Sequence, residues 1–149
     1  MLSIDVKILD ERIRDCMPTY ATDGSAGMDI RACIDAPIIL GPRQSALVPS
    51  GISFSIDDSQ YAAVLLPRSG LGHNHGIILG NTIGLIDSDY QGSLQVSLWN
   101  RSDKSFSIEP MDRVAQLVII PVIRAQWRVV EEFGAVSGRA AGGFGSTGQ

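Results

Sequence analysis

Hydrophobic and polar residues alternate in four short stretches of the chain, which are residues 4–8, 52–56, 93–98 and 106–108. Serine, aspartate, lysine or glutamine separates the apolar side chains in these stretches. Such a period of two is typical of strands with one buried face. Proline and glycine interrupt the chain frequently, and no long window has the apolar spacing of a helix. The pattern predicts an all-β barrel or jelly-roll sandwich of short, mostly antiparallel strands.

Two later segments depart from this alternation. Residues 117–123 are almost continuously apolar and are interrupted by Pro121, which predicts a strand covered on both faces by the core or by a neighbouring subunit. Residues 134–148 contain six glycines and few apolar side chains, too few to pack unaided. We therefore expect a single domain over residues 1–149 whose C-terminal tail, residues 133–149, is flexible until a ligand orders it.

Composition narrows the class of protein. The 149 residues are 44% hydrophobic and 19% charged with a net charge of -4, which fits one soluble domain large enough to bury its own core. The absence of a long apolar run or a leader pattern predicts a cytoplasmic protein with no membrane contact. The acidic balance disfavours binding to nucleic acid. Cys16 and Cys33 lack metal-ligand spacing and are expected to be free thiols, a disulfide being the alternative.

The tail contains a G-x-G-x-x-G sequence over residues 143–148. In dinucleotide-binding proteins this motif lies between a strand and the helix that binds the pyrophosphate. Only Gln149 follows here, so we expect no such helix. The backbone N–H groups and the hydroxyls of Ser146 and Thr147 could still form a phosphate nest, and a disordered end is the alternative.

Residues 87–92 begin like a calcium-binding loop, with carboxylates at alternate positions and a glycine at the sixth. Leu98 occupies the place of the final bidentate acid, which argues against such a loop. The alternative is an aspartate-rich turn that enters the strand predicted over residues 93–98.

Residues after the proline at position 67 offer two further candidate sites. His73 and His75 could share a zinc ion, but no third ligand lies nearby in the sequence, so a polar loop is the better interpretation. Arg68, Ser69 and Gly70 combine a guanidinium, a hydroxyl and accessible backbone, which are the groups that grip a phosphate.

Five segments resemble, in order and spacing, the five motifs of the trimeric deoxyuridine triphosphatase (dUTPase) family. They are residues 26–32, 67–71, 80–92, 112–116 and 139–148. The resemblance covers most of the chain and implies a distorted jelly-roll, or β-clip, barrel. It also implies a homotrimer with shared active sites.

The resemblance implies a reaction as well. Family members hydrolyse dUTP to dUMP and diphosphate by attack of water on the α-phosphorus, which keeps uracil out of DNA and supplies dUMP for dTMP synthesis. Asp87 matches the general base, and Gln116 matches a residue near the α-phosphate. Mg²⁺ is the implied cofactor, held mainly by the triphosphate, with Asp29 contacting it through water. Positioning and charge neutralisation are what such phosphoryl transfer asks of a protein.

Further positions match substrate contacts of the family. The phosphate contacts are Arg68, Ser69, Gly70 and Gln116, with Arg139, Gly145, Ser146 and Thr147 closing from the tail. The uracil contacts are Asn81, Gln95 and the backbone of Leu85, Ile86 and Asp87, with Phe144 stacking on the base when the tail closes. Tyr90 matches the residue that packs under deoxyribose and excludes a 2′-hydroxyl.

Two positions depart from the family pattern. Ala140 stands where glycine commonly follows the tail arginine, which would stiffen tail closure. Met111 follows Pro110 where the family usually has glycine. Because a type II turn needs positive φ at that place, we expect a type I turn.

Two other functions compete with this interpretation. The related dCTP deaminases use a glutamate in hydrolysing the base, and no glutamate of this chain lies in a matching motif; they are Glu11, Glu109, Glu131 and Glu132. A catalytically idle nucleotide-binding module is the second alternative, and the presence of Asp87 together with the whole tail motif argues against it.

Overall fold

The computed structural model describes residues 2–135. Ten strands and two short helices follow one another in these residues. They are β1 (Asp5–Ile8), the 3₁₀ helix η1 (Glu11–Cys16), β2 (Met28–Arg31), β3 (Ile38–Leu40), β4 (Ser45–Ser55), β5 (Tyr61–Pro67), the π-helix η2 (Leu71–His75), β6 (Ile77–Leu79), β7 (Gly84–Ile86), β8 (Ser93–Asn100), β9 (Phe106–Ile108) and β10 (Arg113–Pro121). The predicted all-β class is confirmed.

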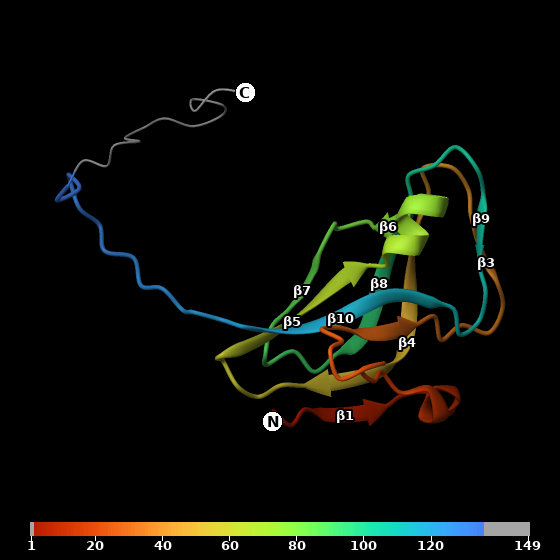
Figure 1. Ribbon diagram of the computed structural model, residues 1–149, viewed down its shortest axis with the longest axis horizontal. Coiled ribbons are helices and arrows are strands. Elements are labelled where there is room, and N and C mark those ends of the chain that lie inside the picture. Colours follow the sequence, from red (N-terminus) through yellow and green to blue (C-terminus); the bar gives the residue numbers. More distant parts are fainter. Residues whose placement is uncertain (1, 136–149) are drawn as a thin grey trace.

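Every strand pairing is antiparallel. One sheet has the order β1-β4-β8-β6, a second has β2-β10-β5-β7, and β3 and β9 form a two-stranded ribbon. Figure 1 shows the two larger sheets packed into one distorted jelly-roll with the ribbon at one end. Strands distant in sequence lie side by side in it, so the segments singled out in the sequence are brought onto a few shared edges.

The alternating stretches supply the core. In β8 the side chains of Leu94, Val96 and Leu98 are buried, while those between them are more exposed. In β4 the second half of the strand, including Ile52 and Phe54, is buried against them. The alternation predicted for residues 93–98 is thus confirmed, because the pleat sends successive side chains to opposite faces.

Residues 117–121 form the second half of β10, so the strand predicted over residues 117–123 is confirmed up to Pro121, but its expected cover on both faces is not seen within the described part of this chain. β10 ends at Pro121, and Ile123 is 96% exposed. Leu117 is buried, but Ile119 is only half-buried. Within one chain this segment therefore lacks the second cover that was expected, and an apolar face of the sheet stays open.

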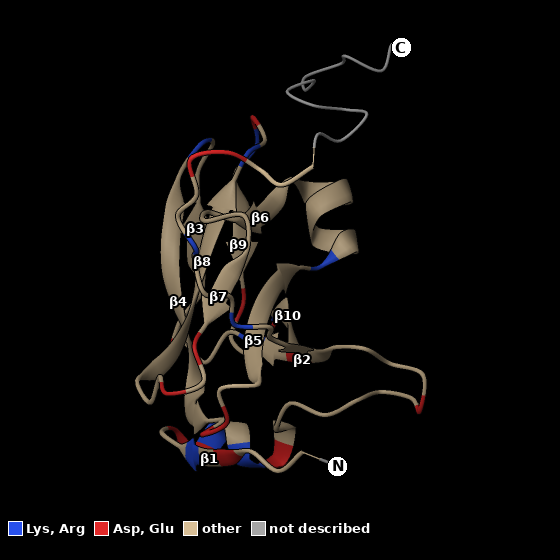
Figure 2. Cartoon of the chain, turned by 90° about the vertical axis from the view of Figure 1, so that its left-hand side faces the viewer, with Lys and Arg blue, Asp and Glu red and all other residues tan. Residues whose placement is uncertain are grey.

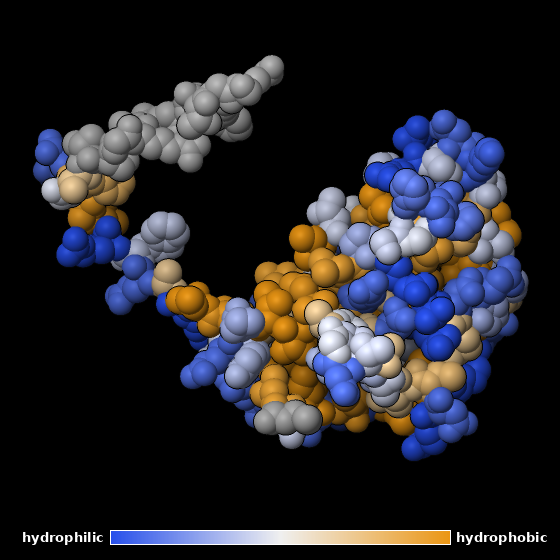
Figure 3. All heavy atoms as spheres, in the orientation of Figure 1, coloured by the Kyte–Doolittle hydropathy of each residue, from blue (hydrophilic) through white to orange (hydrophobic). Residues whose placement is uncertain are grey.

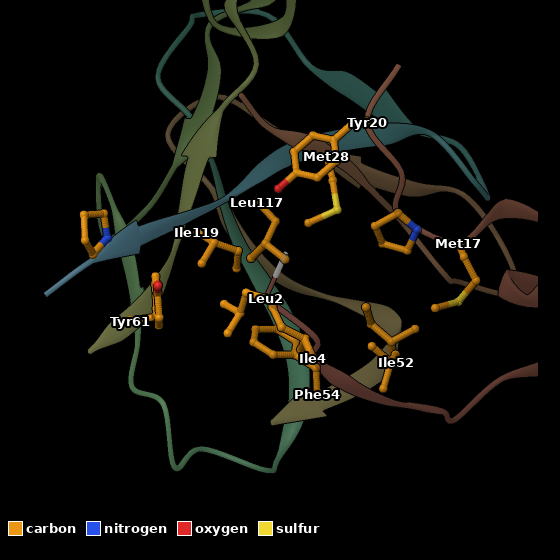
Figure 4. A pocket seen from close by; sticks show the side chains of 13 residues that line it. Leu2, Ile4, Met17, Tyr20, Met28, Ile52, Phe54, Tyr61, Leu117 and Ile119 are labelled. Atoms are coloured by element: carbon orange, nitrogen blue, oxygen red, sulfur yellow. The ribbon is translucent and has the colours of Figure 1, made fainter. Parts of the chain in front are cut away.

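That open face is a groove of about 380 Å³, which we call the apolar groove. It runs between β1 on one side and β2 and β10 on the other, as Figure 4 shows. Its lining is Leu2, Ile4, Val6, Met17, Pro18, Tyr20, Met28, Ile52, Phe54, Tyr61, Leu117, Ile119 and Pro121. The predicted strand β1 forms, although Val6 is 42% exposed.

The chain leaves the sheets at the end of β10. Residues 122–135, which we call the arm, extend away from the body as the blue ribbon of Figure 1. Trp127, Val129 and Phe133 are each more than four-fifths exposed. Large apolar side chains that alternate along an extended segment, with Ile123 before them, are typical of a strand that lacks its partner.

The turn at Met111 differs from the prediction. Met111 has φ of 67°, and Asp112 N–H donates to Glu109 O over 3.1 Å. Positive φ at the third residue of such a turn defines type II, so the expected type I turn is wrong. The strained conformation is held because Met111 N–H donates to Ala32 O (2.7 Å) and Arg31 Nη1 donates to Met111 O (2.9 Å). Ala140 lies outside the described residues.

Candidate active site

A polar pocket of about 440 Å³ opens beside the β7 hairpin, and we call it the hairpin pocket. β7, the turn after it and β8 supply most of its wall. Its lining is Leu47, Leu65, Leu79, Asn81, Gly84, Leu85, Ile86, Asp87, Tyr90, Ser93, Leu94, Gln95 and Ser97. Every hairpin residue that was predicted to contact uracil or the sugar, and the predicted general base Asp87, therefore lines this one cavity.

The aspartate-rich turn is built as predicted. Tyr90 N–H donates to Asp87 O over 3.2 Å, and β8 begins at Ser93. Asp87 is exposed to solvent at the mouth of the pocket. An exposed carboxylate beside a polar cavity can accept a proton from a water molecule held there.

A neighbouring strand anchors this turn from outside. Ser53 Oγ donates to Gln91 O over 2.7 Å, and Ser53 also lies opposite Ser93 in the β4–β8 ladder. Ser53 is buried although its side chain is polar. The sequence interpretation missed this residue, because a serine in an alternating strand normally faces solvent, and no motif includes it.

A second group of predicted residues meets where β2, β5 and β10 run together. Asp29 Oδ1 lies 2.9 Å from Arg68 Nε, and Asp29 Oδ2 accepts from Arg113 Nη1 over 3.2 Å. Arg68 Nη1 donates in turn to Arg113 O over 3.2 Å. Figure 2 shows charged positions at this meeting point within sheets that are otherwise mostly uncharged. Two guanidinium groups joined by one carboxylate form a site suited to phosphate oxygens.

Gln116 belongs to the same group. It lies opposite Asp29 in the β10–β2 ladder and opposite Leu66 in the β10–β5 ladder. Directly opposite residues share a face of the sheet, so Gln116 and Asp29 lie together. A Cβ atom at Gly27 would lie 3.2 Å from Val118 Cγ2 and 3.4 Å from Gln116 Oε1, so the glycine of the first motif packs closely against β10 beside this amide.

Ser69 and Gly70 are exposed between Arg68 and η2. The following residues do not form the predicted polar loop but the short helix η2, and the ring of His75 packs against that of Phe106 at a tilt of 46°, with ring centroids 5.0 Å apart. No group of three potential metal ligands occurs among residues 2–135. Cys16 and Cys33 are free thiols, so no disulfide joins them. None of the described helices is long and apolar enough to span a membrane.

The hairpin pocket and the cluster around Asp29 lie at different points along β5. Ile86, the neighbour of Asp87, pairs with Ala63, which precedes Arg68 by five residues of nearly continuous strand. Five residues of a strand span about 17 Å. The candidate residues of this chain therefore form two separate half-sites, one at the hairpin pocket and one around Asp29. Arg139, Phe144, Gly145, Ser146 and Thr147 lie outside the described residues.

Comparison with known proteins identifies the family. The dUTPase family model matches residues 15–148. A deoxyuridine 5′-triphosphate nucleotidohydrolase of Methylibium petroleiphilum is 62% identical over 149 residues, covering 100% of this chain and 99% of that protein. A protein of the same name from Bordetella avium is also 62% identical, with the same coverage.

Solved structures agree with the fold. The dUTPase of Staphylococcus bacteriophage 80alpha, in complex with dUPNHPP, superimposes with a TM-score of 0.88 at 28% sequence identity, and the match covers 100% of both chains. The dUTPase from phage phi11 of S. aureus gives a TM-score of 0.78 over 89% of this chain and 99% of that chain at 24% identity, which supports the fold alone. The all-β fold is thus shared with enzymes that hydrolyse a nucleoside triphosphate. The chain belongs to the dUTPase family.

Proposed function

We propose that this chain is a cytoplasmic hydrolase that converts dUTP and water to dUMP and diphosphate, with a Mg²⁺-dependent attack of water on the α-phosphorus. The observation that carries the proposal is the hairpin pocket, which holds Asp87 beside every hairpin residue expected to contact the uracil and the sugar. Family membership over nearly the full chain supports the same reaction.

Asp87 acts as the general base in this proposal. Its carboxylate accepts a proton from the attacking water while the oxygen approaches the α-phosphorus. The turn between Asp87 and Tyr90 holds the carboxylate at the pocket mouth. Positioning matters here, because phosphoryl transfer gains most from a nucleophile that is correctly oriented.

The second half-site binds the triphosphate. Arg68 presents its guanidinium to the phosphate oxygens, and Ser69 and Gly70 add a hydroxyl and an accessible backbone N–H. Gln116 donates from its amide to the α-phosphate. Arg113 organises the site, since it shares Asp29 with Arg68. These donors offset the negative charge that develops on the phosphates.

The residues of this half-site fit a Mg²⁺ ion that is held mainly by the phosphates of the substrate. Asp29 offers one partly exposed carboxylate, already paired with two arginines, and the described residues contain no three-ligand cluster. Mg²⁺ usually keeps several waters and binds through substrate phosphates, so Asp29 would reach the ion through water. Bound there, Mg²⁺ would neutralise phosphate charge.

Base and sugar selectivity come from the hairpin. Asn81, Gln95 and the backbone of residues 85–87 present hydrogen-bonding groups at the spacing that a strand pair fixes, and these groups read the uracil edge. Tyr90 packs under the deoxyribose. Phe144 stacks on uracil when residues 139–148 close, which excludes water from the reaction.

The active form in this proposal is a homotrimer in which each active site takes residues from more than one subunit. Because Asp87 and Arg68 are separated by a strand length of about 17 Å, one subunit cannot present both to the same α-phosphate. A neighbouring subunit can supply the missing half. The apolar groove and the exposed arm support assembly, and Figure 3 shows the apolar surface of the body next to the root of the arm.

Release of pyrophosphate and of ammonia from dUTP, dCTP, dTTP and UTP tests the function, each with Mg²⁺ and with a chelator. We expect pyrophosphate from dUTP alone, and only with Mg²⁺. Ammonia from dCTP would indicate a deaminase instead, and no product from any nucleotide would indicate a binding module. Sedimentation of the same sample tests the trimer independently of activity.

A further inference from the structure

We infer that Gly92 is a specificity-determining residue, because its missing side chain leaves the space in which the ring of Tyr90 lies. The inference rests on the proposed role of Tyr90 as the wall that accepts deoxyribose and rejects ribose. In this inference, Gly92 determines where the ring of Tyr90, and therefore that wall, is placed.

The contact between the two residues is very close. A Cβ atom built on Gly92 would lie 2.6 Å from Tyr90 Cζ and 3.0 Å from Cε2, and it would also overlap the Tyr90 hydroxyl. Real Cβ atoms essentially never approach heavy atoms within 3.0 Å. Any side chain at this position would therefore force either the backbone or the ring to move.

Backbone conformation does not explain the glycine. Gly51 and Gly76 are the glycines with positive φ among the described residues, and Gly92 is not one of them. An alanine could adopt the backbone angles of Gly92 without the steric cost of the left-handed region. What position 92 requires is space above its Cα atom.

The backbone of the turn cannot easily give way. The carbonyl of Gln91, which forms the peptide bond to Gly92, accepts the 2.7 Å hydrogen bond from Ser53 Oγ. On the other side of Gly92, Ser93 is paired with Ser53 in the ladder. The buried Ser53 thus fixes the chain both before and after Gly92.

The ring of Tyr90 is held more weakly. It is part of a residue that is 44% exposed, and its hydroxyl donates one hydrogen bond, over 3.1 Å, to Ser93 O. A single solvent-exposed hydrogen bond stabilises a side-chain conformation only weakly, because water offers the hydroxyl equivalent partners. A methyl group at position 92 would therefore displace the ring, and the sugar wall of the hairpin pocket would move with it.

The experiment compares kcat/KM for dUTP and UTP in Gly92→Ala, Tyr90→Ala and the double variant. Gly24→Ala is the matched control, because Gly24 is also exposed and a Cβ atom there would meet nothing within 4 Å. We expect Gly92→Ala to lower the preference for dUTP over UTP about tenfold or more, the range that loss of one shaped contact gives. In the Tyr90→Ala background the same substitution should leave that preference unchanged, because the ring it displaces is gone. Gly24→Ala should behave as the unmodified chain.

The outcomes separate this inference from the proposed function. If Tyr90→Ala leaves the preference intact, the proposed sugar contact is wrong. If Tyr90→Ala lowers the preference and Gly92→Ala does not, only the role of Gly92 is overturned. Should Gly92→Ala fail to fold, the double variant decides. Folding restored by Tyr90→Ala would support the competition for space, and a second failure would overturn it.

Discussion

Two of the hollows in the described part of the chain are similar in size and opposite in chemistry. The apolar groove measures about 380 Å³ and the hairpin pocket about 440 Å³. Aliphatic and aromatic side chains line the groove, whereas amide, carboxylate, hydroxyl and backbone groups alternate with leucines in the pocket. Volume therefore does not distinguish a ligand site from an assembly surface. A ligand site is distinguished instead by the few polar groups that converge on it.

Within residues 2–135, backbone strain occurs beside only one of these two hollows. Four non-glycine residues of the described chain have positive φ, and none of them lines either hollow. One of them, Thr82, lies next to Asn81 at the edge of the hairpin pocket. Strain of this kind is concentrated at functional sites, where surrounding contacts hold it in place.

Asp87→Asn is expected to have the largest effect. The amide cannot accept the proton of the attacking water, so kcat should fall about a hundred- to ten-thousand-fold, the usual contribution of a general base. Affinity for dUPNHPP, measured by calorimetry, should stay nearly unchanged, as should the sedimentation coefficient. Turnover like that of the unmodified chain would remove Asp87 from the base role and leave the hairpin pocket as a binding site alone.

Removal of residues 139–149 should come next. The tail carries Arg139 and Phe144, and without them water enters the pocket and the γ-phosphate loses its contacts, so kcat/KM should fall about a hundredfold or more. The melting temperature should stay close to that of the full chain, because the core consists of strands that end before the tail. A large loss of stability would instead make the tail a structural element.

Val6→Asp tests the other hollow. Val6 is 42% exposed on the wall of the apolar groove, so one folded subunit tolerates the charge, but an assembled apolar interface does not. We expect dissociation to monomers at about micromolar concentration, by sedimentation, and a specific activity that rises with protein concentration. Lys7→Asp introduces the same carboxylate on the opposite face of β1 and should leave assembly intact. Unchanged assembly of the Val6 variant would show that the groove is not an interface.

The sequence predicts local features of this molecule better than distant ones. Alternation along β8 is decided by each residue and its neighbours, and so is the turn at Asp87. The pairing of Asp29 with Arg68 and Arg113 depends on strand register, which no single segment determines. The separation of the two half-sites is equally invisible to motif order, since consecutive motifs in sequence lie at distant points of the sheet.

The sequence also fails to predict which polar residues are buried, because their burial depends on distant contacts. Asn100 is fully buried, and its amide donates to Leu40 O and Lys104 O while its carbonyl accepts from Ser102 N–H and Oγ. Nothing in the alternating pattern distinguishes it from a solvent-facing asparagine. Met111 was mispredicted for a related reason. The contacts with Arg31 and Ala32 hold a turn type that the local sequence disfavours.

Thr82→Asn should have the smallest effect and concerns the strain at the hairpin pocket. Thr82 has φ of 63° in a tight turn closed by Ile83 N–H donating to Asn81 O over 2.7 Å. A hydrogen bond between residues i and i+2 around a positive φ defines a γ-turn, which is strained for L-residues and most of all for a β-branched one, so asparagine should bear it at lower cost. The substitution should raise the free energy of unfolding by about 0.5–1 kcal/mol, and the exposed Thr19→Asn, where φ is not positive, should not. Chemical denaturation measures both. If Thr82→Asn stabilises the chain and leaves kcat/KM for dUTP unchanged, the turn only bears the strain; if kcat/KM falls, the strain positions Asn81 for the base.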